Sequence, residues 1–142
     1  ETSGYFDFDA VRTTLQRMDM IFMDLKHTDP VKHQYFTGVD NRRILENMKR
    51  LSEIDAEIVI RIPVIGGVNA DAENISKSAA FVHCYLPQAK MELLPYHRFG
   101  FGKYEALGLE MPSNQFFTPS DDEMAEFKQM VKNAGVELVD FR

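Results

Sequence analysis

A histidine that follows a short apolar segment is the starting candidate for a functional residue in this sequence. Residues 90–97 combine apolar, β-tolerant residues, which indicates a buried strand, and Pro95 ends its ladder because its nitrogen carries no hydrogen. His97 stands just beyond that proline. In parallel α/β proteins ligands bind outside the carboxyl ends of the strands, so an imidazole there is a candidate binding group. A loop histidine hydrogen-bonded to the backbone is the alternative interpretation.

Four charged side chains are expected at the same rim as His97. Asp24, Lys26 and Arg61 lie near the ends of two other predicted strands, and Glu1 stands where a preceding strand would end. Charges inside a barrel cost free energy unless they are paired or used by a ligand. Two cations and a histidine suit a carboxylate or a ribose, and two carboxylates suit a cation or an amine. A structural ion network, such as Asp24 with Arg61, is the alternative.

Size and composition restrict the class of protein. The 142 residues are enough for one domain, and we expect a single domain over residues 1–142. The 16 basic against 22 acidic residues give a net charge of −6, which argues against nonspecific nucleic-acid binding. No apolar run approaches the ~20 residues that cross a membrane, and no signal peptide is evident. The one cysteine excludes an internal disulfide and favours a reducing compartment such as the cytoplasm.

Hydrophobic periodicity predicts alternating helices and strands. Helices are predicted at about residues 9–19, 40–54, 71–86 and 121–134, and strands at 20–25, 57–64, 90–97 and 136–141. The expected helix N-caps are Asp9, Asp40, Asp71 and Ser120, the last within a capping box. Residues 27–38 are expected to form a loop or a short irregular helix. Residues 99–117 are expected to form a long loop for lid or partner contacts.

This alternation favours an α/β fold with a parallel sheet and right-handed crossovers. Four such units cannot close an eight-stranded barrel. We therefore expect an open (β/α) half-barrel, a fragment of a partial TIM-type barrel that lacks its first strands, with an open doubly wound sheet as the alternative. A half-barrel exposes a sheet edge and apolar surface, so we expect the fragment to self-associate.

An ordered set of segments resembles a known family. The segments are Glu1-Thr2-Ser3-Gly4, Asp24-Leu25-Lys26, Ile60 to Asn69, Leu93-Leu94-Pro95-Tyr96-His97 and Lys103 to Gly108. They are similar in order and spacing to segments of the radical S-adenosylmethionine enzymes that activate glycyl radical enzymes, such as pyruvate formate-lyase activating enzyme. The likeness covers essentially the whole chain but only the later part of the family's length.

The resemblance implies the activity of the parent protein. It would be an oxidoreductase that binds S-adenosylmethionine on a [4Fe–4S] cluster in an anaerobic cytoplasm. With an electron donor, it would cleave S-adenosylmethionine reductively and place a radical on a backbone glycine of a partner enzyme.

The resemblance also assigns roles to site residues. S-adenosylmethionine would be bound by Lys26, Arg61, His97, Asp24, Pro63 and Leu94. In that set Lys26 would hold the methionine carboxylate, His97 would reach the ribose, and Pro63 and Leu94 would flank the adenine. A monovalent cation would be held by Glu1, Thr2, Asp24 and the carbonyl of Phe22.

The chain departs from the family at the cluster motif. Cys-x-x-x-Cys-x-x-Cys is absent, and Cys84 alone cannot hold a cluster that takes several thiolates. Cys84 lies in a predicted helix, where a buried structural cysteine is expected. We therefore expect no bound cofactor and no radical chemistry from this fragment alone. A stand-alone half-barrel that binds a nucleotide or small anion is one alternative, and a purely structural ion network is another.

Overall fold

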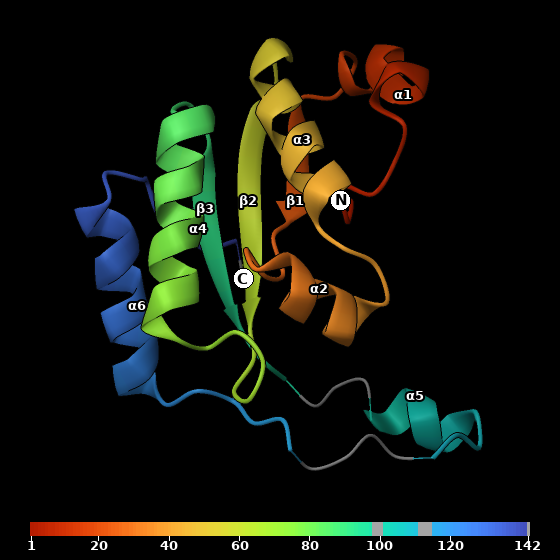
Figure 1. Ribbon diagram of the computed structural model, residues 1–142, viewed down its shortest axis with the longest axis vertical. Coiled ribbons are helices and arrows are strands. Elements are labelled where there is room, and N and C mark those ends of the chain that lie inside the picture. Colours follow the sequence, from red (N-terminus) through yellow and green to blue (C-terminus); the bar gives the residue numbers. More distant parts are fainter. Residues whose placement is uncertain (98–100, 111–114, 142) are drawn as a thin grey trace.

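A parallel sheet forms the centre of the molecule. The computed structural model describes residues 1–97, 101–110 and 115–141. Its sheet has three strands in the order β1 (Met20–Asp24), β2 (Glu57–Val64) and β3 (Lys90–Pro95). Both neighbouring pairs are parallel, and all three strands run towards the bottom of Figure 1. The α/β class, the parallel sheet and the first three predicted strands are confirmed, with β3 ending two residues early.

The fourth predicted strand, residues 136–141, is wrong. In the described residues this segment makes only a single parallel bridge, between Leu138 and Met91. Phe141 then donates its backbone N–H to a carboxylate oxygen of Glu92 at 2.7 Å. The backbone therefore leaves the ladder, because a side chain takes the donor that a strand would give to its neighbour.

Helices connect the strands and cover one face of the sheet. They are α1 (Phe8–Leu15), α2 (Pro30–Thr37), α3 (Arg42–Arg50), α4 (Ala72–Tyr85), α5 (Phe101–Ala106) and α6 (Asp121–Asn133), with a 3-10 turn, η1, at Leu51–Glu53. Helices α3, α4 and α6 lie on the same side of the sheet (Figure 1). None of the helices in the described ranges is long and apolar enough to cross a membrane.

Two of the segments expected to be irregular contain helices. Residues 27–38 hold α2, as one of the two expectations had it. Residues 99–117 were expected to be a long loop but hold the short helix α5. Residues 98–100 and 111–114 of that segment lie outside the described residues.

Two predicted helix starts are wrong by one or two positions. Asp7 caps α1 in place of Asp9, since its side chain accepts the N–H of Asp9 itself at 3.1 Å. Asn41 is the N-cap of α3 in place of Asp40. The carboxylate of Asp40 accepts the backbone N–H of Arg42, the first residue of the helix, at 3.0 Å. The first helix also ends at residue 15, four residues earlier than predicted. The other two predicted N-caps, Asp71 and Ser120, are confirmed.

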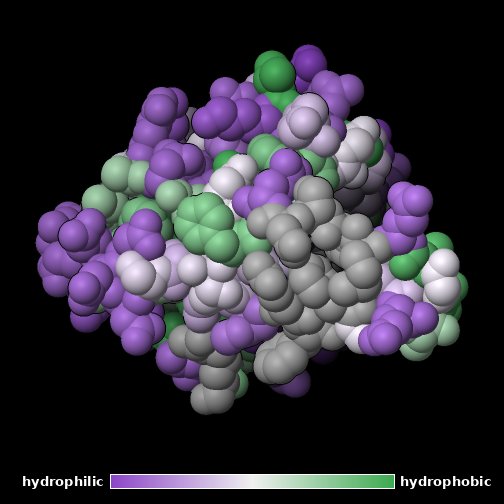
Figure 2. All heavy atoms as spheres, turned by 90° about the horizontal axis from the view of Figure 1, so that it is seen from below, coloured by the Kyte–Doolittle hydropathy of each residue, from purple (hydrophilic) through white to green (hydrophobic). Residues whose placement is uncertain are grey.

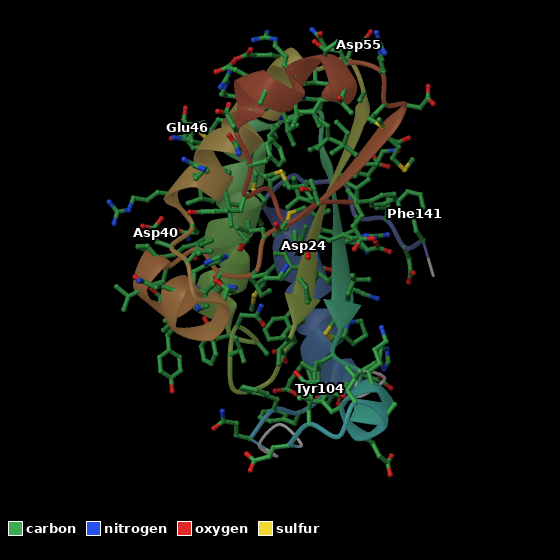
Figure 3. The ribbon with its side chains drawn as sticks, turned by 90° about the vertical axis from the view of Figure 1, so that its right-hand side faces the viewer. Asp24, Asp40, Glu46, Asp55, Tyr104 and Phe141 are labelled. Atoms are coloured by element: carbon green, nitrogen blue, oxygen red, sulfur yellow. The ribbon has the colours of Figure 1, made fainter. Side chains whose placement is uncertain are left out.

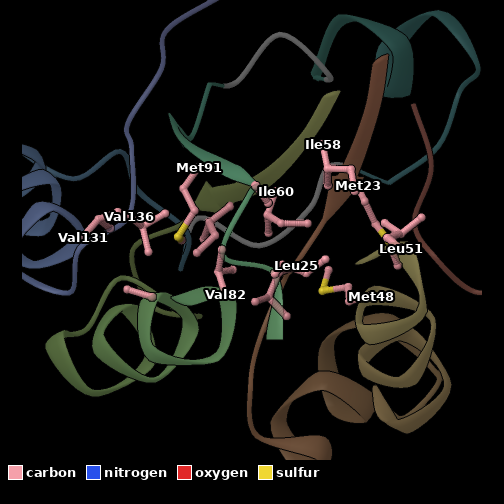
Figure 4. Close-up of a cluster of buried hydrophobic side chains, with 14 of the residues drawn as sticks. Met23, Leu25, Met48, Leu51, Ile58, Ile60, Val82, Met91, Val131 and Val136 are labelled. Atoms are coloured by element: carbon pink, nitrogen blue, oxygen red, sulfur yellow. The ribbon is translucent and has the colours of Figure 1, made fainter. Parts of the chain in front are cut away.

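The hydrophobic core lies between the sheet and the helices. As the alternation predicted, one face of β1 and β2 is fully buried: Ile21, Met23, Ile58, Ile60, Ile62 and Val64. Figure 4 shows Met23, Ile58 and Ile60 together with Met48 of α3 and Val82 of α4. Burying aliphatic side chains of this size stabilises a fold by about 1.5–3 kcal/mol each.

Cys84 corrects another expectation. It is exposed, not buried. The buried positions of α4 include Ile75, Ala79 and Val82, so Cys84 lies on the opposite, solvent-facing side of the helix.

The opposite face of the sheet carries polar and aromatic side chains. Arg61 is the register partner of Asp24 in β1 and of Glu92 in β3, so the three side chains leave the same face. On this face the ring of Phe22 packs edge-on against Phe141, with 5.3 Å between centroids. Figure 3 shows the sheet from the side, with Phe141 on the side away from the helices.

Candidate functional site

A pocket of about 410 Å³ lies at the carboxyl ends of the strands. Lys26 and His27 line it from beyond β1, Pro63 from β2, and Tyr96 and His97 from beyond β3. Helix α2 supplies a further wall. Figure 2 looks onto this end of the molecule and shows hydrophobic and hydrophilic side chains side by side. A mainly apolar wall with a few polar groups is typical of small-molecule sites.

Lys26 is the pocket's ammonium group. Its Nζ lies 2.5 Å from Oδ2 of Asp24, and its side chain is 39% exposed. The ion pair between Asp24 and Arg61, suggested from the sequence, is replaced by this one. An ammonium carries three hydrogens, so Lys26 has capacity left for a ligand carboxylate.

Arg61 lies on the polar face of the sheet and is absent from the described pocket wall. Its Nε donates to Oε2 of Glu92 at 2.7 Å, and an η nitrogen donates to Oε2 of Glu1 at 3.1 Å. The guanidinium carbon also lies 3.8 Å from the ring centre of Phe22. Glu92 is only 1% exposed, so this carboxylate depends on Arg61 for its charge partner.

The predicted rim is thus divided into two groups. Lys26 and His97 line the pocket, and Asp24 is bonded to Lys26. Arg61 and Glu1 belong to an ion network with the buried carboxylate of β3. The interpretation as a structural network fits the second group. The ligand roles of the first group stay predictions.

The two residues expected to flank an adenine are neighbours. Pro63 and Leu94 are register partners on β2 and β3 and leave the same face of the sheet. Pro63 lines the pocket, whereas Leu94 is partly buried beside it and is not among the described lining residues.

The four residues expected to hold a monovalent cation are adjacent, but all of them have other partners. The N–H of Thr2 donates to the carbonyl of Phe22 at 2.9 Å, and the N–H of Asp24 donates to the carbonyl of Thr2 at 3.0 Å. The carboxylates of Glu1 and Asp24 pair with Arg61 and Lys26. In the described part of the chain, no three His, Cys, Asp or Glu side chains are grouped to hold a metal ion.

Sequence reasoning missed Asn69, which fixes the pocket wall. Its Nδ2 donates to the carbonyls of Lys26 and Pro63, both at 2.7 Å, and its Oδ1 accepts from the N–H of Ile65 at 2.7 Å. One buried amide therefore ties the segments after β1 and β2 together. A single asparagine after two glycines gave no periodic signal for this role.

Two buried histidines in the wall were also missed. His27 follows β1 and His33 lies in α2; they are 4% and 2% exposed. Burial lowers the pKa of His27, and the charge of Lys32 acts in the same direction, so the ring is neutral at pH 7. Sequence alone does not separate such residues from surface histidines. His27 precedes α2 in a loop, and α2, which contains His33, has no clear hydrophobic stripe.

The pocket, the sheet and the helix order can now be compared with known proteins. A crystal structure of a domain of pyruvate-formate lyase-activating enzyme from Bacteroides vulgatus superimposes with a TM-score of 0.76 and 31% identity. The match covers 94% of this chain and 73% of that domain. The chain belongs to the family of glycyl radical enzyme activating enzymes.

Curated members of this family agree. The trans-4-hydroxy-L-proline dehydratase activating enzyme of Clostridioides difficile is 37% identical over 132 residues, which cover 92% of this chain and 43% of that enzyme. The choline trimethylamine-lyase activating enzyme of Oleidesulfovibrio alaskensis is 34% identical over 131 residues and is covered to 42%. The chain thus spans less than half the length of these relatives.

The fold is also found outside the activases. A radical SAM methyltransferase from Sphaerobacter thermophilus has a TM-score of 0.60 at 17% identity, which shows a common fold alone. No protein-family model matches the sequence. The match to the activase domain, at 31% identity, identifies the three parallel strands as part of a radical SAM partial barrel, as the sequence predicted.

The residues of the chain do not fit the iron–sulfur cluster of the family. Its one cysteine, Cys84, is exposed on α4, among the helices that cover the other face of the sheet. A single thiolate there cannot replace a set of several cluster ligands. The pocket does fit part of S-adenosylmethionine, since it offers an ammonium for a carboxylate and apolar walls for a flat ring.

Proposed function

We propose that this chain is part of an activating enzyme that generates a glycyl radical on a partner enzyme. Support comes from the match to the domain of pyruvate-formate lyase-activating enzyme, which spans 94% of the chain at 31% identity. The curated relatives named above are activating enzymes for different partners, so the identity of the partner does not follow from the family. S-adenosylmethionine and an electron donor are the proposed co-reactants, and the cytoplasm is the proposed compartment.

The proposed part of this chain is to bind and orient the adenosyl ligand. Lys26 would hold the methionine carboxylate, and His97 would reach the ribose. Pro63 and Leu94 would flank the adenine. Arg61 is proposed to support the sheet beside the pocket through its ion pair with Glu92, and not to contact the ligand. The bound ligand supplies the radical chemistry, and the chain alone is proposed to be inactive because it has no cluster ligands.

S-adenosylhomocysteine tests this proposal, because it keeps the carboxylate, ribose and adenine and reacts with nothing. Its binding to the chain is measured by isothermal titration calorimetry. Lys26→Met should weaken binding by about 10- to 100-fold, the usual effect of a charge-assisted hydrogen bond. Lys77→Met is the matched control, since Lys77 pairs with Glu73 on the surface of α4 and is not among the residues that line the pocket. No binding by the wild type, or equal binding by both variants, would contradict the proposal.

The second candidate function is a stand-alone module that binds a nucleotide or small anion. The observation that favours it is a pocket whose described walls come from this chain without any cluster ligand. Anaerobic reconstitution with iron and sulfide separates the two functions. Formation of an iron–sulfur absorbance would contradict the proposed inactivity of the isolated chain. Adenosyl binding by a protein that supports no activation of any glycyl radical enzyme would favour the module.

A further inference from the structure

Three buried asparagines hold the backbone that carries Lys26. Residues 26–28 lie between β1 and α2, so the carbonyls of this segment are outside both a strand ladder and a helix. Side-chain amides take the place of those backbone partners. They belong to Asn41, the N-cap of α3, to Asn69, between β2 and α4, and to Asn74, in the first turn of α4. All three are buried.

The carbonyls of three successive residues accept hydrogen bonds from these amides. Nδ2 of Asn69 donates to the carbonyl of Lys26 at 2.7 Å. Nδ2 of Asn41 donates to the carbonyls of His27 and Thr28, both at 2.8 Å. A buried amide that loses its partner is costly, so this segment is held to one path.

The neighbours of Lys26 on either side are fixed as well. Oδ1 of Asn74 accepts both the N–H and the hydroxyl of Thr28, each at 2.9 Å. On the other side, the N–H of Leu25 donates to the carbonyl of Arg61 in β2 at 2.8 Å. The backbone of Lys26 therefore has a set position relative to the sheet.

Two of the amides have no hydrogen left for a ligand. An asparagine side chain carries two N–H hydrogens. Asn69 uses them on the carbonyls of Lys26 and Pro63, and Asn41 uses them on the two carbonyls named above. Asn41 is also not among the residues that line the described pocket. Its contribution to binding therefore has to pass through the backbone that it holds.

We infer that Asn69 and Asn41 are positioning residues for Lys26: by holding the carbonyls of residues 26–28, they set where the ammonium meets a ligand carboxylate. Asp24 holds the other end of the same side chain, with Oδ2 2.5 Å from Nζ. A cation held at both ends loses less freedom on binding than a flexible one, which raises its affinity for an anion. The inference rests on the proposed function for the ligand and adds two residues that act through the backbone.

Two ligands separate this positioning from a general effect on folding. S-adenosylhomocysteine and 5′-methylthioadenosine both contain adenine and ribose, but only the first has a carboxylate. Serine is too short to reach two carbonyls, so Asn69→Ser and Asn41→Ser each remove the paired hydrogen bonds. In isothermal titration calorimetry each variant should bind S-adenosylhomocysteine about 3- to 10-fold more weakly, the equivalent of one ordinary hydrogen bond. Binding of 5′-methylthioadenosine should not change.

A double-variant comparison shows whether the effect passes through Lys26. In a chain that already carries Lys26→Met, neither serine substitution should weaken S-adenosylhomocysteine further, because no ammonium is left to position. Additive losses would mean that the asparagines act by another route and would overturn the inference.

Asn47→Ser is the matched control. Asn47 is also buried and also donates Nδ2 to two carbonyls, those of Gly4 at 2.8 Å and Phe6 at 2.9 Å. It is not among the residues that line the described pocket. The control variant should unfold at a lower urea concentration and keep the wild-type affinity for both ligands.

The outcomes distinguish the inference from the proposed function. If Asn69→Ser and Asn41→Ser weaken both ligands by the same factor, or weaken neither, the asparagines have a structural role alone; the inference is then wrong and the proposed function stands. A wild type that binds neither ligand, or Lys26→Met with wild-type affinity for S-adenosylhomocysteine, would overturn both.

A measurement on the wild type decides if the serine variants do not fold. In the ligand-free protein, the side-chain NH₂ hydrogens of Asn41 and Asn69 should exchange with solvent far more slowly than those of the exposed Asn133. Their NMR signals should keep their positions when S-adenosylhomocysteine is added. Fast exchange, or signals that move on addition, would show that the segment is not fixed before the ligand binds and would overturn the inference.

Discussion

Replacing Arg61 with methionine should destabilise the chain by about 3–4 kcal/mol at pH 7. The variant leaves the carboxylate of Glu92, which is 1% exposed, without its charge partner. Breaking a buried pair in this way costs about 3–5 kcal/mol. The loss has an upper limit, because the carboxyl can take up a proton instead. Protonating a model-peptide glutamate at pH 7 costs about 3.7 kcal/mol, from its reference pKa near 4.3 and about 1.36 kcal/mol per unit.

The same reasoning gives a pH dependence. In the variant the folded state favours the neutral carboxyl, so the folded state binds the proton more readily than the unfolded chain does. The destabilisation is therefore largest at high pH and is lost as the pH falls towards the unfolded value. By the arithmetic above, the cost falls to about 1 kcal/mol at pH 5.

Urea unfolding followed by circular dichroism at pH 5 and pH 7 measures both numbers. Arg12→Met is the matched control, because Arg12 and Glu53 are 40% and 45% exposed and their pair should contribute under about 1 kcal/mol. Adding Glu92→Leu to Arg61→Met should recover stability, since no buried charge is then left. An Arg61→Met cost equal to that of the control, or one that does not change with pH, would refute this reasoning.

Three further results are expected. Cys84 should react with a thiol reagent in the folded protein without denaturant, because it is exposed; a reaction that requires urea would restore the buried assignment. Asp71→Ala should lower the free energy of unfolding by about 1 kcal/mol in the same urea assay, because the N-cap of α4 loses its side-chain acceptor, and no change would show that the cap is dispensable. The free energy of unfolding of the wild type should fall as the pH drops below about 6.5, because burial lowers the pKa of His27 and the unfolded chain takes up the proton first. The contribution of His27 to this fall is at most about 1.4 kcal/mol per pH unit. His27→Asn should make the free energy of unfolding less dependent on pH in this range.

Much of the fold follows from the sequence because the core strands alternate clearly. Residues 57–64 form β2 with the predicted bounds, since every second side chain is aliphatic and buried. The start of α6 was also predictable, because the two hydrogen bonds of the capping box join Ser120 and Glu123, which are close in the sequence. Residues 136–141 show the limit: their alternation is equally clear, but a carboxylate from another strand takes one of their donors.

The candidate site was predictable only in part. The positions of Lys26 and His97 follow from strand ends, and the structure brings both to one pocket. Which carboxylate pairs with which cation did not follow, because Asp24 and Glu92 are both register partners of Arg61 and side-chain geometry decides between them. Buried amides and imidazoles in loops have no periodicity at all, so tertiary structure alone reveals them.

The pocket stands on the most protected backbone of the molecule. β2 is hydrogen-bonded on both sides, and two bonds just beyond the strands, from Leu25 N to the Arg61 carbonyl and from Tyr96 N to the Val64 carbonyl, attach the neighbours of Lys26 and His97 to it. Amides in such a strand exchange with solvent only when the whole sheet opens, whereas single bridges at the two edges fray locally. The single bridges of Thr2 to β1 and of Leu138 to β3 can therefore open and close without disturbing the spacing between the ammonium and the imidazole.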